Sequence, residues 1–256
     1  TGLRFRANFY KTINGTAAVL RRVESQIPEM EQFNLPQSLY DIVDMHKGLV
    51  LVTGPTGSGK STTLAAIVNE INKTRTANII TVEDPVEFIH KDNRSIVSHR
   101  EVGKQTKTFA AALKAALRED PDVILVGEMR DLETISLALT AAETGHLVLG
   151  TLHTASASQT IDRIIDVFPT SQQMQIRVQL SSSLIGVISQ TLCKTIDNKR
   201  TLAAEILVNN NAIANLIREA KASQVYSQLQ IGGKFGMQTL EQSLSQLVSQ
   251  STITTD

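Results

Sequence analysis

The chain has 256 residues, of which 41% are hydrophobic and 20% are charged, a composition that excludes a wholly disordered protein and allows a sizeable core. Its 25 Lys and Arg residues balance 25 Asp and Glu residues, so a generic nucleic-acid coat, which usually carries a basic excess, is disfavoured. The single cysteine, Cys193, can form neither an internal disulfide nor a multi-cysteine zinc site, which fits a reducing compartment.

The first residues alternate like the middle of a strand, with apolar Leu3, Phe5 and Phe9 separated by polar side chains. The Asn14-Gly15 turn signal and a second apolar-rich segment at 17–23 complete a predicted hairpin. The chain does not begin with Met, so we expect Thr1 to be a cut inside a domain. No signal peptide opens the chain, and no apolar run approaches the roughly 18 residues of a membrane span.

Strand and helix patterns alternate from residue 48 onward, after a linker marked by Pro28 and Pro36. Buried strands are predicted at 49–53, 78–82, 123–126 and 147–151. Helices are predicted at 60–72, 109–118 and 132–142. This alternation predicts an α/β fold with a mostly parallel sheet and helices on both of its faces.

The composition changes after Pro169, where Ser, Gln and Asn become common and helical periodicity dominates. Helices are predicted at 171–188, 211–220, 223–230 and 238–249, with a β-type passage at 189–208. We therefore expect a mainly helical C-terminal part over residues 170–256.

Residues 54–61, GPTGSGKS, match the phosphate-binding template G-x-x-x-x-G-K-[ST] in full and lie between a predicted strand and a predicted helix. Glycines let backbone N–H groups surround phosphate oxygens, and the helix start adds positive potential there. We expect Lys60 to reach the outer phosphates and the Ser61 hydroxyl to ligate Mg²⁺. The alternative, a chance glycine-rich turn, is disfavoured by the flanking elements. The candidate nucleotide-binding residues are Gly54, Pro55, Thr56, Gly57, Ser58, Gly59, Lys60, Ser61 and Thr62.

Two further predicted strands end in acids, Glu83 after the strand at 78–82 and Glu128 after the strand at 123–126. Ligands of open α/β sheets bind at the carboxyl ends of the strands, so both acids should lie near the nucleotide phosphates. One acid can act on the attacking water and the other can hold Mg²⁺ or its waters. Gly127 stands where most such enzymes place Asp.

His153 follows the strand predicted at 147–151, and its position makes it a candidate sensor of the γ-phosphate. Spacing alone leaves a purely structural role equally open. The remaining candidates are basic residues that could act as arginine fingers or could be ordinary surface charges. They are Arg6, Arg21, Lys114 and Arg118.

Four boxes then occur in order, and the run from 48 to 169 resembles the secretion ATPases of type IV pili and type II secretion almost continuously. The boxes are GPTGSGKSTT (54–63), TVEDPVEF (81–88), REDPDVILVGEMRD (118–131) and TAAETGHLVLGTLHT (140–154). The resemblance implies a RecA-like ATPase domain over 36–256, with its core at 48–169. It also implies that 1–35 are the C-terminal part of a truncated PAS-like domain with its linker, and that the assembly is a homohexamer.

The same resemblance implies roles for the candidate residues toward ATP. Glu83 would act on the attacking water, Glu128 would support Mg²⁺, and His153 would sense the γ-phosphate. Arg6 and Arg21 would be arginine fingers from the N-terminal domain. Lys114 and Arg118 would be two further basic residues of the family, although Lys114 stands where relatives usually have Arg, which puts a bidentate contact there in doubt.

Within the family, the retraction branch is indicated by AIANLIRE at 212–219, which resembles the AIRNLIRE box of pilus retraction ATPases except at Ala214. The single cysteine cannot build the tetracysteine zinc module of the extension branch. The implied function is pilus retraction at the cytoplasmic face of the inner membrane, peripheral to it, acting on a platform protein and the pilus machinery and not directly on nucleic acid.

Three alternatives stay open. The first is another motor of this superfamily, for extension, secretion or conjugation. The second is a RecA-like nucleic-acid translocase, although seven Phe, three Tyr and no Trp argue against a stacking channel. The third is a non-catalytic scaffold that binds ATP as a structural ligand.

Overall fold

The computed structural model describes residues 4–23, 26–33 and 37–254. The strands are β1 (Arg4–Thr12), β2 (Gly15–Val23), β3 (Gly48–Thr53), β4 (Asn78–Glu83), β5 (Ile96–Glu101), β6 (Val123–Val126), β7 (Leu147–Leu152), β8 (Leu184–Lys194) and β9 (Arg200–Val208). The α-helices are α1 (Gln37–Val43), α2 (Lys60–Thr74), α3 (Phe109–Ala116), α4 (Leu132–Glu143), α5 (Ala157–Asp166), α6 (Thr170–Ser183), α7 (Asn211–Arg218), α8 (Val225–Ile231) and α9 (Leu240–Ser249).

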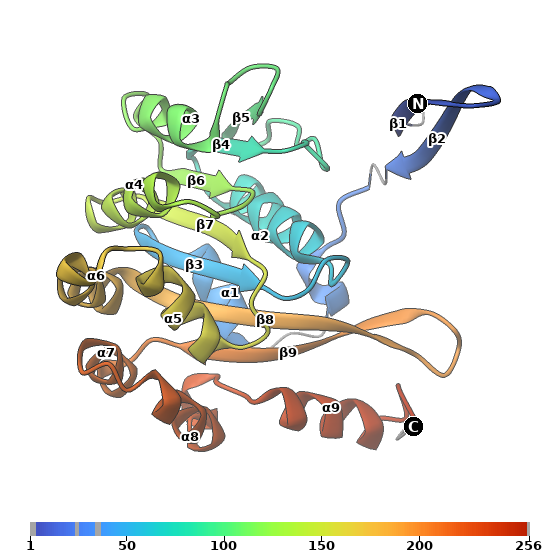
Figure 1. The fold of residues 1–256 in the computed structure, drawn as a ribbon. Helices are drawn as coiled ribbons and strands as arrows, with labels where there is room; N and C mark the ends of the chain where they lie inside the picture. Colours follow the sequence, from blue (N-terminus) through green and yellow to red (C-terminus); the bar gives the residue numbers. More distant parts are fainter. Residues whose placement is uncertain (1–3, 24–25, 34–36, 255–256) are drawn as a thin grey trace.

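Seven of the described strands form one sheet in the order β5-β4-β6-β7-β3-β8-β9 (Figure 1). Every neighbouring pair is parallel except β8 and β9, which form an antiparallel hairpin at one edge. The predicted α/β fold with a mostly parallel sheet is therefore confirmed. Strands β3, β6 and β7 are buried along their whole length, as expected for the centre of a sheet covered on both faces.

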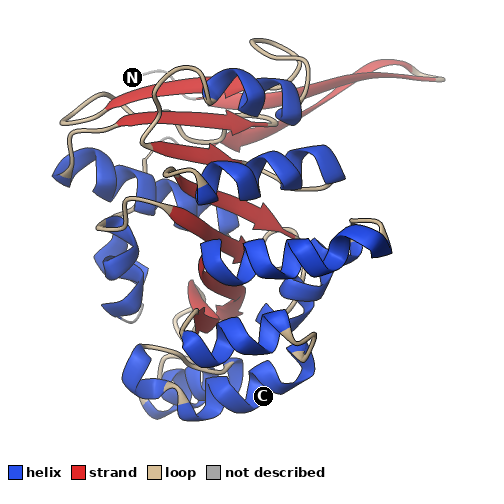
Figure 2. Ribbon diagram, turned by 90° about the vertical axis from the view of Figure 1, so that its left-hand side faces the viewer, coloured by secondary structure: helices blue, strands red, loops and turns tan. Residues whose placement is uncertain are grey.

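Helices cover both faces of the sheet (Figures 1 and 2). One large apolar cluster joins α4, α5 and α6 to the sheet, and a second joins α1 and α2 to the opposite face. Helices α7, α8 and α9 lie beyond β9, at the hairpin edge of the sheet (Figure 1). Within the described part of the chain, no helix is long and apolar enough to cross a bilayer.

Strands β1 and β2 form a separate two-stranded sheet, the hairpin predicted at the start of the chain, which projects away from the larger sheet (Figure 1). Their register places Arg6 directly opposite Arg21, so the two guanidinium groups share one face of the hairpin. Both side chains are exposed. Like charges placed opposite one another repel, so this pair would be stabilised by an anion.

The helix predicted at 171–188 is too long, because α6 ends at Ser183 and β8 begins at Leu184. The apolar residues that continue the pattern pair with β3 instead. The Asn209 side chain donates to the Ser181 and Leu184 carbonyls at 3.0 and 2.8 Å, which satisfies backbone groups where the helix stops.

Other boundaries differ in smaller ways. The helix predicted at 109–118 ends at Ala116, so Arg118 lies two residues beyond it and does not end it. The β-type passage predicted at 189–208 is the hairpin of β8 and β9, which begins earlier, at Leu184. Three of the described strands and α-helices have no counterpart among the predicted elements: α1, β5 and α5. Strand β5 is a partly exposed edge strand with mostly polar side chains, so it carries little apolar signal.

Candidate nucleotide site

Four loops meet at the carboxyl edge of the parallel sheet. Strand β3 leads into the phosphate-binding loop, and its neighbour β7 leads to His153. Strand β6 leads to Glu128, and β4 ends on Glu83. Because β4, β6, β7 and β3 are adjacent and parallel, these residues converge from four separate segments of the chain.

The phosphate-binding loop is glycine-dependent where it turns. Gly54 has φ 139°, and a Cβ there would lie 2.2 Å from the Gln190 carbonyl oxygen. Helix α2 starts at Lys60, and its N-cap, Gly59, has φ 89° and contributes no capping side chain. The first amides of α2 are therefore not engaged by a side-chain cap, as an anion site at a helix start requires.

Lys60 folds back over the loop. Its Nζ donates to the Gly54 and Pro55 carbonyl oxygens at 2.9 and 3.1 Å. Burial lowers the pKa of Lys60, while the charge of Glu128 acts in the opposite direction. The ammonium is thus held at the start of the phosphate-binding loop by two backbone carbonyls, where it can contact a bound phosphate chain.

Gln190 on β8 braces the loop from the opposite side. Its Nε2 donates to the Ser58 carbonyl at 2.7 Å, and Gln190 is 2% exposed. Beside it, the Thr53 and Ser189 hydroxyls lie 2.8 Å apart and join β3 to β8. Sequence reasoning missed Gln190 because 132 residues separate it from Ser58.

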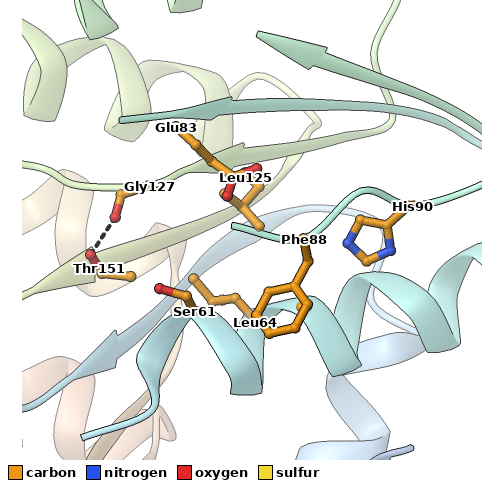
Figure 3. A pocket seen from close by; sticks show the side chains of 9 residues that line it. Ser61, Leu64, Glu83, Phe88, His90, Leu125, Gly127 and Thr151 are labelled. Atoms are coloured by element: carbon orange, nitrogen blue, oxygen red, sulfur yellow. Dashed lines mark hydrogen bonds between the residues drawn. The ribbon is translucent and has the colours of Figure 1, made fainter. Parts of the chain in front are cut away.

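Glu83 lies in a small cavity of about 20 Å³ beside the loop (Figure 3). Ser61, Gly127 and Thr151 lie on one side of this cavity, and Phe88 and His90 on the other. Such a volume holds about one water molecule. Burial raises the pKa of Glu83 to about 7, near the value that suits a general base at neutral pH.

His153 joins two of the converging loops. Its Nε2 lies 3.0 Å from Glu128 Oε1, and its Nδ1 lies 3.4 Å from Lys60 Nζ. A lysine ammonium can only donate, so Nδ1 is the acceptor and Nε2–H donates to Glu128. Arg130, which sequence reasoning did not single out, pairs with the same carboxylate.

The residues fit ATP and Mg²⁺. The Ser58 hydroxyl is buried and has no partner among the described residues, so it is ready for a polar ligand. Within the described residues, no group of three His, Cys, Asp or Glu side chains could hold a metal. Mg²⁺ bound with a nucleotide is usually held by one or two protein oxygens together with the nucleotide phosphates. Ser61 and Glu128 offer such oxygens.

The four basic residues predicted from the sequence to contact ATP do not lie at the nucleotide site of the same chain. Arg6 and Arg21 lie on the β1–β2 hairpin, and Lys114 and Arg118 are exposed on and just after α3. None of them lines the cavity around Glu83.

A phosphate-binding loop between β3 and α2, with acids at the ends of two strands of the same parallel sheet, defines a P-loop ATPase. The chain belongs to the family of type II/IV secretion system proteins, whose family model matches residues 1–255. It is thus an ATPase of the class that drives secretion and pilus machinery.

Individual relatives are similar over nearly the whole chain. The twitching motility protein of Neisseria gonorrhoeae is 56% identical over 98% of this chain and 67% of its own length. The type IV pilus retraction ATPase PilT of Pseudomonas aeruginosa is 54% identical over 98% of this chain and 73% of its own length.

Solved structures agree with these relatives. A crystal structure of the pilus retraction motor PilT with bound ADP has a TM-score of 0.92 and 54% identity, covering 98% of this chain and 71% of that one. The Legionella pneumophila ATPase DotB has a TM-score of 0.88 and 30% identity, covering 99% of this chain and 70% of that one. The expected family and a nucleotide ligand are both supported by these matches.

Proposed function

We propose that this chain is the motor ATPase of type IV pilus retraction, acting as a Mg²⁺-dependent homohexamer at the pilus base. It would work peripherally, at the cytoplasmic face of the inner membrane, against a platform protein of the pilus machinery. The observation that carries the proposal is the similarity to retraction ATPases, 54% identity over 98% of the chain. The single cysteine of the printed sequence, Cys193, cannot build the tetracysteine zinc module that the resemblance assigns to the extension branch, which favours retraction.

In this proposal the residues at the carboxyl edge of the sheet divide the work of hydrolysis. The loop amides and Lys60 bind the phosphates of ATP, and Glu83 takes a proton from the attacking water. His153 reports the γ-phosphate, because an anion that draws Lys60 away also changes the imidazole contact with Glu128. Mg²⁺ held by Ser61 and Glu128 would neutralise charge on the phosphate oxygens.

We assign the exposed basic residues to contacts that this chain does not make by itself. The Arg6 and Arg21 pair would close over ATP as a phosphate clamp when the hairpin unit, residues 1–35, moves against the ATPase domain, 36–256. Lys114 and Arg118 would face a neighbouring subunit of the ring. Both assignments rest on exposed cations outside the cavity and on the need to neutralise charge in phosphoryl transfer.

Helix α7 contains most of the box that resembles retraction ATPases. Its Ile213 and Ile217 are fully buried in the main apolar cluster, so the apolar face of the helix packs within the domain. The face available to a partner is the polar one, where the Asn215 and Arg218 side chains are exposed.

A deletion strain tests retraction directly. Loss of a retraction motor leaves excess pili and abolishes twitching, whereas loss of an extension motor leaves no pili. Complementation with the Lys60→Ala variant should not restore twitching, while the exposed-site control Lys47→Ala should. A deletion strain that carries no pili would overturn retraction in favour of extension. ATPase stimulation by DNA would favour the translocase alternative instead.

A further inference from the structure

Strand β5 places His99 beside the strand that carries Glu83. In the parallel register of β4 and β5, Thr81 is the partner of His99. Thr81 and Glu83 are two residues apart on β4, so their side chains lie on the same face of the sheet. The three side chains therefore form a row, with the fully buried Thr81 between the imidazole and the carboxyl group.

Hydrogen bonds fix the direction of this row. The backbone N–H of His90 donates to His99 Nε2 at 3.1 Å, and His99 Nδ1 lies 2.9 Å from Thr81 Oγ1. A backbone N–H can only donate, so Nε2 is the unprotonated nitrogen of a neutral His99 and Nδ1 carries the hydrogen. His99 then donates to the Thr81 hydroxyl, whose own hydrogen is left to donate onward. The Thr81 side chain in turn hydrogen-bonds to Glu83.

The His90 ring holds the imidazole in place. The two rings are stacked, with centroids 5.7 Å apart and an angle of 16° between their planes. His90 is 7% exposed and lines the same cavity as Glu83 (Figure 3). Burial lowers the pKa of His90 to about 4, so the stacked ring is neutral and does not repel its neighbour.

We infer that His99 is a positioning residue for hydrolysis, acting through the Thr81 hydroxyl to orient the Glu83 carboxylate toward the attacking water. The inference rests on the proposed role of Glu83 and adds two residues to it. The last side-chain torsion of glutamate is broad, so packing alone does not fix its oxygens. Hydrogen bonds from the Glu87 backbone and the Thr81 hydroxyl supply that constraint, and His99 directs the hydrogen of the second.

Substitutions that remove the hydrogen-bonding groups of Thr81 or His99 test this inference in the full-length protein. Thr81→Val keeps the side-chain shape and removes the hydroxyl, and His99→Leu removes both ring nitrogens. We expect each to lower kcat about tenfold, the lower end of the range for groups that orient a reacting residue, with KM for ATP within about twofold of wild type. The matched controls Thr81→Ser and His99→Gln can still accept and donate, so both should retain kcat within about twofold.

The outcomes separate this inference from the function on which it rests. If Glu83→Gln keeps wild-type activity, the proposed role of Glu83 fails. If Glu83→Gln is inactive while Thr81→Val and His99→Leu turn over normally, the positioning role alone is overturned. Equal losses in the Ser and Gln controls would also overturn it, because they would indicate a packing role. Adding Thr81→Val to Glu83→Gln should cause no further loss of kcat. An additional loss of about tenfold would contradict the inference that Thr81 acts through Glu83.

Discussion

His153 Nε2 lies 3.0 Å from Glu128 Oε1, and this contact joins the loop after β7 to the loop after β6 at the edge of the nucleotide site. Because the other ring nitrogen faces Lys60, the imidazole connects the phosphate-binding loop to the acid expected to support Mg²⁺. A change at the phosphates can therefore reach two neighbouring strands through one side chain.

We expect His153→Ala to lower kcat by about tenfold or more while nucleotide affinity changes by no more than about twofold, since the imidazole touches reacting-site residues and not the loop amides. The measurement is steady-state phosphate release together with titration of a fluorescent ADP analogue. His46→Ala, at the exposed turn before β3, is the control and should behave like wild type. An unchanged kcat in His153→Ala would show that the histidine is only structural.

Lys60→Ala should reduce ATP hydrolysis by more than about 100-fold, because it removes the ammonium held over the loop and its charge on the outer phosphates. Phosphate release under saturating ATP measures this. The control is Lys47→Ala, an exposed lysine just before β3. Turnover like that of wild type in Lys60→Ala would remove the assignment of this loop as the catalytic site.

The acid side of the pH–rate profile should report Glu83, whose pKa burial raises to about 7. A general base must be deprotonated, so kcat/KM should rise with pH below about 7 and level off above it. Where the profile is steepest, kcat/KM should increase about tenfold per pH unit. A flat profile between about pH 5.5 and 8 would be inconsistent with Glu83 as the base.

The same pKa predicts how stability depends on pH. A carboxyl group whose pKa is raised by folding binds more protons in the folded state, so its effect on stability becomes unfavourable as pH rises from about 4.5 to about 7. Glu83→Gln removes this effect. Its Tm should therefore exceed that of wild type at pH 8, and the difference should vanish near pH 4, where both side chains are neutral. A Tm below that of wild type at pH 8 would contradict burial as the cause.

Much of the site could be predicted because its signals are local. The loop from Gly54 to Ser61 is one contiguous motif, and Glu83, Glu128 and His153 each follow a short apolar run that reads as a strand. The rule that parallel strands present their carboxyl ends at one edge then brings them together without any structure. The arrangement of β4, β6, β7 and β3 agrees with that expectation.

The rest depends on contacts between distant segments. Strand β5 is polar and lies at the sheet edge, so neither the strand nor the contact of His99 with Thr81 has a periodic signal. The boundary between α6 and β8 is equally hidden, because the apolar residues after Ser183 continue a pattern that fits helix or buried strand. Only the pairing of β8 with β3 decides between them.

Gln190 shows how such a distant contact can serve nucleotide binding. Its side-chain amide donates a hydrogen bond to the Ser58 carbonyl, and its backbone lies against Gly54. Strand β8 therefore supports the phosphate-binding loop at two points through Gln190. We expect Gln190→Ala to weaken ADP binding about tenfold, because an unpaired buried carbonyl costs about 1–3 kcal/mol and the loop can relax only by moving its amides. Isothermal titration with ADP measures the affinity, and the exposed Gln175→Ala on α6 is the control. Since Gln190 does not line the cavity around Glu83, kcat at saturating ATP should change by less than about threefold, and a large kcat loss with intact affinity would assign Gln190 to the chemical step instead.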